Sequence, residues 1–133
     1  MLEEIQRTWQ DFAQKHVYAY RCVEPAIFEL HAPDHFRRLL GRSKLETIEA
    51  PDGQLLACLV FENPEGSEMP VVHWAWTHPK HRNLGHQRKL WAQAGFAPDT
   101  IVTITHLTVV SERMAEKYGW IFSEFPLYER HDQ

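Results

Sequence analysis

The apolar residues of the first fifteen positions recur at helical spacing. Leu2, Ile5, Trp9 and Phe12 are separated by three or four residues, and charged or amide side chains lie between them. This period predicts an amphipathic helix over Leu2–Lys15. Its apolar stripe is expected to pack in the core.

The apolar pattern is less regular between this helix and position 42. The Tyr, Val and Cys content of Val17–Val23 favours a strand. Ala26–Leu30 is a short apolar run without a period, so helix and strand both stay open for it. Asp34–Leu40 has the pattern of a short helix, and Gly41 is expected to stop it.

An alternating pattern and turn residues predict a β-hairpin in the middle of the chain. Leu45–Ala50 alternates, Pro51–Gln54 has turn residues, and Leu55–Phe61 is a longer apolar run. A second turn over Asn63–Ser67 leads into the apolar and aromatic strand Met69–Thr77. These three strands are expected to be antiparallel to one another.

Helical and strand patterns alternate in the second half of the chain. Helices are predicted over Leu84–Ala94 and Val109–Tyr118, each followed by glycine, with a strand over Ile101–Leu107 between them. Trp120–Arg130 is expected to supply one or two closing strands around its proline. This order predicts an α/β fold with at least one parallel strand pair at the centre of a mixed sheet.

Composition narrows the class of protein. The chain has 133 residues, 44% of them hydrophobic, which suits a single domain over residues 1–133 with a proper core. The net charge of −4 argues against nucleic acid as a partner of the whole surface. Cys22 and Cys58 form no paired motif and are expected to be reduced. No apolar run is long enough for a signal or membrane segment, and a cytoplasmic location is expected.

The segment from Val71 to Gly95 holds the strongest candidate site. A strand runs through a basic turn into a helix, and a helix N-terminus has unpaired backbone N–H groups and the positive end of the helix dipole. Arg82, Arg88 and Lys89 add fixed positive charge there. These features suit a phosphate-like anion. An ordinary strand-to-helix connection with solvated basic residues is the alternative.

The turn also carries a family resemblance. Arg82-Asn83-Leu84-Gly85-His86-Gln87 resembles the pyrophosphate-binding loop of the GNAT acyltransferases, R/Q-x-x-G-x-G/A, which follows their fourth strand and opens their third helix. Thr77 occupies the Val place of the family's strand end, V-x-P-x-x-R. The resemblance implies that the pyrophosphate of acetyl-CoA, or of another acyl-CoA, is bound by Arg82, Asn83, Leu84, Gly85, His86 and Gln87. It also implies that Thr77 binds the cofactor, since the strands Val71–Thr77 and Ile101–Leu107 would flank the pantetheine. Gln87 stands where the family has Gly or Ala, and a long amide there is expected to crowd the cofactor.

A second block resembles the family's N-x-x-A-x-x-L-Y-E-K-x-G-F segment, a helix followed by Gly and an aromatic residue. Aligned on the shared Glu-Lys-x-Gly-aromatic end, the family's Asn falls on Thr108, its Ala on Ser111 and its Tyr on Ala115. That Tyr often acts as the general acid toward the thiolate of coenzyme A. Tyr118, three residues later, is the candidate for a displaced acid.

The resemblance implies a GNAT-like mixed, mostly antiparallel central sheet, flanked by helices, with a parallel pair at the family's fourth and fifth strands. It also implies an N-acyltransferase that moves an acyl group, by default acetyl, from coenzyme A to an amine on a small molecule or a protein. His73 lies near the place of the family's Glu and is the first candidate base, ahead of Glu62 and His106. A hydrogen-bonded histidine on a half-buried strand is the favoured alternative for His73.

Two further functional readings follow from the sequence. Gln87, Thr108 and Ala115 favour a catalytically inactive GNAT-fold protein with a binding or structural role, similar to small proteins of tailed bacteriophages, some of them virion-associated. Such a protein would act through a protein partner or as a homo-oligomer. A GNAT-type enzyme acting on nucleic acid is less favoured, because only the local basic patch supports it.

A histidine pattern also raises a metal hypothesis. His73, His78, His81 and His86 follow one another at spacings of three to five residues, but no Cys or carboxylate completes a recognised ligand spacing. No metal site is therefore expected.

Overall fold

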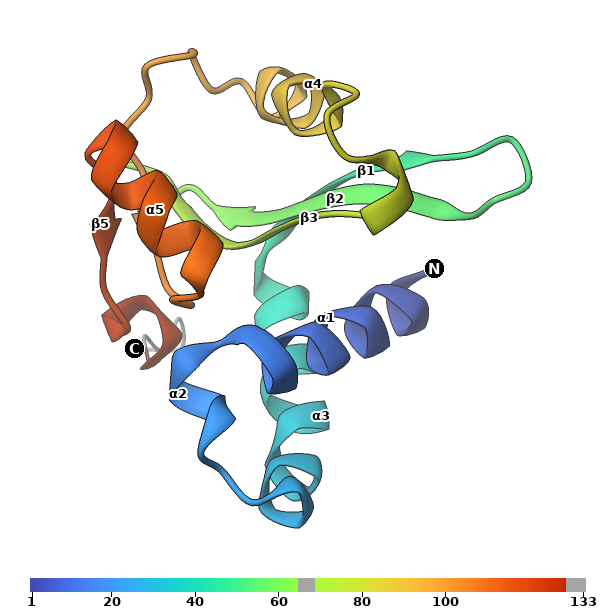
Figure 1. Ribbon diagram of the computed structural model, residues 1–133, viewed down its shortest axis with the longest axis vertical. Helices are drawn as coiled ribbons and strands as arrows, with labels where there is room; N and C mark the ends of the chain where they lie inside the picture. The colour runs from blue at the N-terminus through green and yellow to red at the C-terminus, as the bar shows by residue number, and fades with distance from the viewer. Residues whose placement is uncertain (65–68, 129–133) are drawn as a thin grey trace.

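The central feature is a twisted mixed sheet (Figure 1). The structure, a computed structural model, describes residues 1–64 and 69–128. Within these residues the sheet has five strands in the order β1-β2-β3-β4-β5. The strands are β1 Lys44–Glu49, β2 Leu55–Glu62, β3 Val71–Thr77, β4 Thr103–Ile104 and β5 Ile121–Phe122.

Strand directions confirm the predicted α/β class. β1, β2 and β3 are successively antiparallel, and β3 and β4 form the expected parallel pair. β4 and β5 are also parallel, which was not predicted. The hairpin of β1 and β2 agrees with the predicted one. The predicted turn Asn63–Ser67 lies partly outside the described residues.

Helices cover both faces of the sheet. α1 and α3 lie on one side, and α4 lies on the other (Figure 1). The helices are α1 Leu2–His16, α2 Tyr18–Arg21, α3 Pro25–Arg42, α4 His86–Gln93 and α5 Val109–Tyr118.

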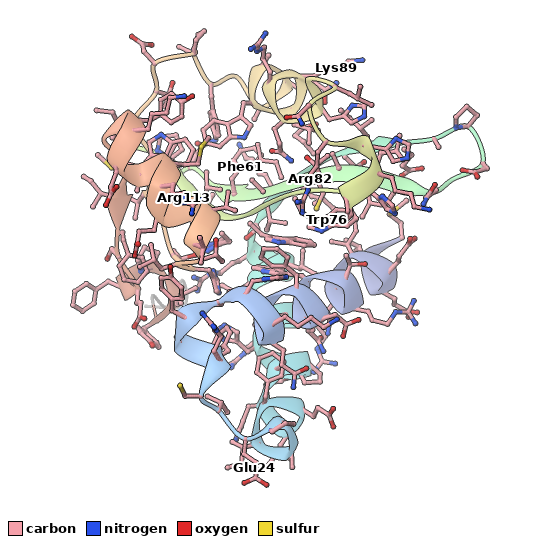
Figure 2. All side chains as sticks on the ribbon, in the orientation of Figure 1. Glu24, Phe61, Trp76, Arg82, Lys89 and Arg113 are labelled. Carbon is pink, nitrogen blue, oxygen red and sulfur yellow. The ribbon has the colours of Figure 1, made fainter. Side chains whose placement is uncertain are left out.

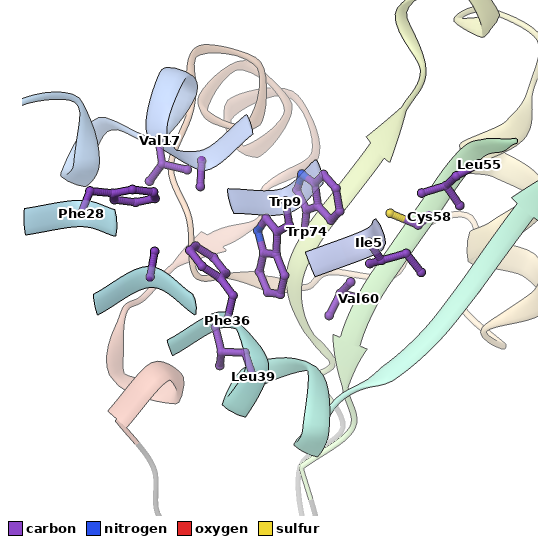
Figure 3. Close-up of a cluster of buried hydrophobic side chains, with 12 residues drawn as sticks. Ile5, Trp9, Val17, Phe28, Phe36, Leu39, Leu55, Cys58, Val60 and Trp74 are labelled. Carbon is purple, nitrogen blue, oxygen red and sulfur yellow. The ribbon is translucent and has the colours of Figure 1, made fainter. Parts of the chain in front are cut away.

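Alternate residues of β2 therefore enter two cores, because successive side chains of a strand point to opposite faces. Cys58 and Val60 join a cluster with Trp9 of α1 and Phe36 of α3 (Figure 3). Ala57, Leu59 and Phe61 face α4, where Leu90 is fully buried. Phe61 points toward α4 and Trp76 toward α1 in Figure 2.

The prediction for the region before β1 was wrong in two places. Val17–Val23 forms no strand: Val17 is extended, and the short helix α2 follows it. Its side chains are used for packing, since Val17 is buried and Tyr20 lies against Phe28 and Phe36. Contacts with the helices have outweighed the β propensity of this segment.

The second error concerns α3, which runs through Pro33 and Gly41 as one helix. A proline inside a helix costs about 3 kcal/mol. The buried stripe Phe28, Ala32, Phe36 and Leu39 continues at helical spacing across that proline, so core burial offsets the cost. The Pro33 carbonyl also accepts a hydrogen bond from Gln6 Nε2.

The remaining elements are shorter than predicted or different in kind. The predicted strand Met69–Thr77 begins two residues later, as β3. The predicted strand Ile101–Leu107 shortens to β4, because β3 and β4 pair over only two residues each. The observed helix α4 begins two residues after the start of the predicted helix Leu84–Ala94 and ends one residue before its end. After β5 a 3₁₀ helix, Phe125–Tyr128, stands where a second closing strand was expected. The last residues of that prediction lie outside the described ranges.

We predict that Phe36→Ala lowers the free energy of unfolding by about 3–5 kcal/mol, because it opens a cavity among rings that exclude water. Phe36 is 0% exposed, and its ring centroid is 4.7 Å from that of Trp9. Leu30→Ala on the same helix is the matched control, since Leu30 is 74% exposed, and its cost should stay below about 0.5 kcal/mol. Urea unfolding measures both. Equal losses for the two variants would contradict this account of the core.

Candidate functional site

A β-bulge in β3 creates the candidate site. Val60 of β2 pairs with Trp74 and Phe61 pairs with Val72, so His73 is an extra residue without a partner on β2. Val72 and Trp74 consequently enter opposite cores although they are two residues apart. In a regular strand these two side chains would lie on the same face.

Beyond the bulge one edge of β3 is open. The parallel ladder to β4 pairs only Val71 and Val72, and the N–H of Thr105 donates the last bond, to the Val72 carbonyl. The N–H of His78 donates to the Leu56 carbonyl at 2.7 Å. Because backbone groups of an antiparallel strand face the partner at alternate residues, those of Ala75 and Thr77 point away from β2. Ala75 is exposed, so this edge is accessible.

The loop after β3 leads from this edge into α4. Gly85 is the N-cap residue of α4 with φ of 80°, and Asn83 has φ of 64°, a left-handed backbone that turns the chain into the helix. Within the described residues no hydrogen bond is donated by the backbone N–H groups of residues 83–87. Arg82, Lys89 and Arg88 are exposed around them. The arrangement provides free N–H donors, the positive end of a helix and basic side chains for an anion.

His86 adds a polar atom without a partner to this end of α4. Its Nε2 is buried and has no hydrogen-bond partner among the described residues. Its ring lies 6.4 Å from that of His81, which is 5.3 Å from that of His78. The three histidines therefore gather near the loop, and His73 is not among them.

Gln87 does not lie over the free N–H groups. Its Nε2 donates to the carbonyls of Trp76 and Cys58, at 2.8 and 3.2 Å, and to the hydroxyl of Thr77 at 3.2 Å. Its Oε1 accepts from Trp91 Nε1 at 3.2 Å. The amide thus joins α4 to β2 and β3, and it points to the sheet rather than to the N-terminus of α4.

The bulge places His73 in a buried polar chain. Its Nε2 is 2.6 Å from Glu62 Oε2, and that oxygen also accepts from Arg42 Nε at 3.2 Å. The side chain of His73 is 0% exposed and that of Glu62 is 12% exposed. Arg42 Nη2 also donates to the Pro126 carbonyl, so it joins α3 to the C-terminal segment.

The chain continues from His73 to the end of β4. His73 Nδ1 is 2.8 Å from Thr105 Oγ1, and the same oxygen is 2.8 Å from His106 Nδ1. His106 is 7% exposed, and its Nε2 is without a hydrogen-bond partner among the described residues. Burial, and next the neighbouring His73, lowers the pKa of His106 to about 3. His106 is therefore neutral at pH 7.

A pocket adjoins this end of the chain. It has a volume of about 400 Å³, and Thr105 and His106 form part of its wall. Burial, and next the charges of Tyr128 and Glu124, raises the pKa of the lining Tyr20 to about 12. The other lining residues come from α2, β5, the 3₁₀ helix Phe125–Tyr128 and the segments next to α2, β4 and β5: Val17, Tyr18, Ala19, Leu107, Phe122, Glu124, Leu127 and Tyr128.

The structure brings together the three candidate bases, His73, Glu62 and His106, but not the candidate acid. Tyr118 is 46% exposed at the end of α5 and stacks on Trp120, with ring centroids 5.6 Å apart. The positions where the resemblance placed family residues have other uses. Thr108 and Ser111 form the capping box of α5, and Ala115 packs against the core on the α4 side.

Sequence reasoning missed Arg42, Thr105 and the pocket. The adjacent Thr105 and His106 belonged to a predicted alternating strand, and alternation would have put them on opposite faces. Arg42 lies just beyond Gly41, where the predicted helix was expected to stop, although α3 continues to Arg42. No signal in the sequence marks the bulge.

The described residues were also compared with the requirements of a metal site and of a membrane-spanning helix. Residues 1–64 and 69–128 contain no group of three or more His, Cys, Asp or Glu side chains placed to hold a metal ion. None of the helices in those ranges combines the length and the apolar composition needed to cross a bilayer.

Comparison with known proteins gives a structural likeness only. No protein-family model and no curated protein matches the sequence. The fold is similar to that of the "Putative acetyl transferase from Pyrococcus furiosus", with a TM-score of 0.56 and 14% identity, over 91% of this chain and 72% of that chain. It also matches the ribosomal-protein-alanine N-acetyltransferase from Brucella melitensis biovar Abortus 2308, with a TM-score of 0.40 and 18% identity, over 89% of this chain and 75% of that chain.

The Pyrococcus likeness confirms the predicted GNAT-like fold, a five-stranded mixed sheet with helices. At this identity it shows the fold alone.

We predict that stability falls in acid partly because of His106. Its pKa is about 3 in the folded chain against an ordinary 6.5. Between these values the unfolded chain binds a proton that the folded chain does not, so stability is lost as pH falls from 6.5 toward 3. The slope is about 1.4 kcal/mol per pH unit.

The His106→Asn variant removes this titration while its amide can still meet the Thr105 hydroxyl. Urea unfolding of both proteins at several pH values gives the free energy of unfolding as a function of pH. The two curves should converge as the pH falls. Curves that stay parallel would show that His106 is not buried in its neutral form.

Proposed function

We propose that this chain is an N-acyltransferase that moves an acyl group, by default acetyl, from coenzyme A to an amine. The observation that carries the proposal is the open edge of β3 beside the free N–H groups that begin α4. In a GNAT-like fold these two features lie where an extended, phosphate-bearing thioester needs donors. The acceptor is an amine on a small molecule or on a protein.

The residues present fit an acyl-CoA. Its pyrophosphate would be held by the N–H groups of Asn83, Leu84, Gly85, His86 and Gln87, with Arg82 and the buried Nε2 of His86 close by. Its amide-bearing arm would pair with the backbone of Ala75 and Thr77, as a peptide adds to a strand edge. The side chain of Gln87 is compatible with this fit, because its amide is hydrogen-bonded to the sheet and does not lie over the free N–H groups.

When bound, the acyl-CoA supplies a thioester carbon that an amine nitrogen attacks; the C–N bond forms and the C–S bond breaks. The chain's own task is to take one proton from the amine and return one to the departing sulfur. His73 is the proposed base. Its ring is closed from solvent and both its nitrogens are engaged, so a proton would reach it through the hydroxyl of Thr105.

Tyr118 stays the proposed acid, in its displaced position. Exposure leaves its hydroxyl free to approach a bound thiolate, but its stacking on Trp120 holds the ring at the end of α5. A Tyr118→Phe variant removes the proton and keeps the stacking. Transfer by that variant at the rate of the unchanged protein would remove Tyr118 from the mechanism.

A second candidate is a catalytically inactive GNAT-fold protein with a binding or structural role, including one encoded by a phage or carried in a virion. The observation that favours it is the structural use of Thr108, Ser111 and Ala115, which stand where the family has functional or conserved positions. The proposed enzyme binds acyl-CoA, and the alternative has no need to.

We predict that acetyl-CoA and CoA bind with micromolar affinity in calorimetric titration at low salt. Arg82→Glu should weaken both by about tenfold or more, because it reverses charge beside the pyrophosphate site. Arg7→Glu makes the same charge change at an exposed residue of α1, on the other side of the sheet from α4, and should leave binding unchanged.

No binding at millimolar ligand would overturn the proposal and leave the inactive alternative. Equal weakening by the two charge reversals would show that only the overall charge of the protein matters, and the loop would then not be the site.

A further inference from the structure

The pocket beside His106 has the chemistry of an amine site. Its wall is mostly apolar and aromatic, and it includes the rings of Tyr18, Tyr20 and Tyr128. Glu124 is its one carboxylate, and no Lys or Arg is among its lining residues in the described part of the chain. Aromatic faces and a carboxylate attract a cation, whereas an anion would meet only repulsion.

His106, one of the residues that line the pocket, has a buried ring nitrogen that lacks a partner in the described part of the chain. His106 Nε2 has no hydrogen-bond partner among the described residues, although the residue is only 7% exposed. A buried polar atom without a partner costs free energy, and a ligand with an N–H group would supply the missing bond.

With His73 neutral, the hydrogen bonds along the chain assign a donor and an acceptor to each contact. The Glu62 carboxylate only accepts, so His73 Nε2 carries a proton. In neutral His73, Nδ1 then accepts the Thr105 O–H, and the Thr105 oxygen accepts from His106 Nδ1–H. Neutral His106 is left with a bare Nε2, which is a hydrogen-bond acceptor and a base.

A proton that arrives at this nitrogen has a route onward. His106 gains it at Nε2 and gives up the proton on Nδ1 to Thr105, and the hydroxyl passes its own proton to His73 Nδ1. The result is a neutral His106 with its proton on Nε2 and a charged His73 beside Glu62. The number of protons balances, and the charge ends in an ion pair instead of on an isolated buried ring.

We propose that this pocket binds a primary amine with an apolar or aromatic body, that His106 Nε2 receives its N–H, and that Thr105 passes the proton to His73. Glu124 attracts the ammonium group to the mouth of the pocket. The inference rests on the proposed acyl transfer for its chemistry, and it names the acceptor class of that reaction. His106 is then the catalytic residue that touches the acceptor, while Thr105 and His73 act behind it.

The binding test uses the full chain without any acyl-CoA, so that it succeeds or fails independently of the cofactor site. 2-Phenylethylamine is titrated at pH 7.5 and compared with 2-phenylethanol, which has nearly the same shape but no charge. The amine should bind more tightly. Glu124→Gln should weaken the amine about threefold to fivefold, as expected for an exposed charge pair, and leave the alcohol unchanged.

Glu116→Gln is the matched control, since Glu116 is an exposed residue of α5 that does not line the pocket. Ala19→Trp is meant to fill the pocket from α2 and should abolish amine binding. Equal affinity for amine and alcohol, or amine binding that survives Ala19→Trp in a folded protein, would overturn the inference.

Imidazole ¹⁵N NMR tests the role of His106 directly. Before amine is added, His106 Nε2 should give the resonance of an unprotonated nitrogen, and addition of 2-phenylethylamine should move it toward the protonated position. Exposed His31 is the reference that should not move. Thr105→Val should remove the tautomer preference of His106, and Thr105→Ser should restore it. A protonated Nε2 in the free protein, or no shift on saturation, would overturn the relay.

If acetyl-CoA fails to bind while the amine binds as described, the proposed function is wrong and the amine pocket stands. If acetyl-CoA binds and the amine does not, the cofactor site stands and this inference fails.

Discussion

The β-bulge at His73 is the constraint on which the candidate site depends. One extra residue in β3 interrupts the ladder with β2, which pairs Trp74 on one side of His73 and Val72 on the other, and the parallel ladder with β4 ends at Val72. The divergence leaves the backbone edge at Ala75 and Thr77 open. It also turns the His73 ring toward the end of β4, where Thr105 completes the polar chain. A regular strand would give neither the edge nor the chain.

A buried polar chain is stable only when nearly all its members are satisfied, and here the neighbours supply what is needed. Arg42 brings a positive charge from α3 to Glu62, and it also bonds the C-terminal segment. The packing of Trp9 and Phe36 around His106 keeps water away and keeps that ring neutral. The atom left without a partner among the described residues, Nε2, belongs to His106, which lines the pocket. Helices α1 and α3 therefore contribute to the site as well as to the core.

The sequence was informative wherever local signals agree with tertiary packing. The hairpin of β1 and β2, the helix α1 and the helix α5 with its glycine stop were predicted because period, turn residues and caps point the same way. Only the Asp34–Leu40 part of α3 was predicted as a helix; its full length was not, because core burial outweighs Pro33, a local helix breaker. The bulge was missed because it depends on a register between two strands. The histidine and glutamate candidates were named from a resemblance, but their common chain arises from three-dimensional contacts with Arg42 and Thr105.

The central claim is that the open edge of β3 and the start of α4 form one binding surface for an acyl-CoA. Amide hydrogen exchange with and without coenzyme A tests it residue by residue. The account predicts slower exchange on binding at Ala75 and Thr77 together with Asn83 to His86, and unchanged exchange in α1, which lies on the other side of the sheet from α4. Protection confined to other elements, or none at saturating ligand, would contradict it.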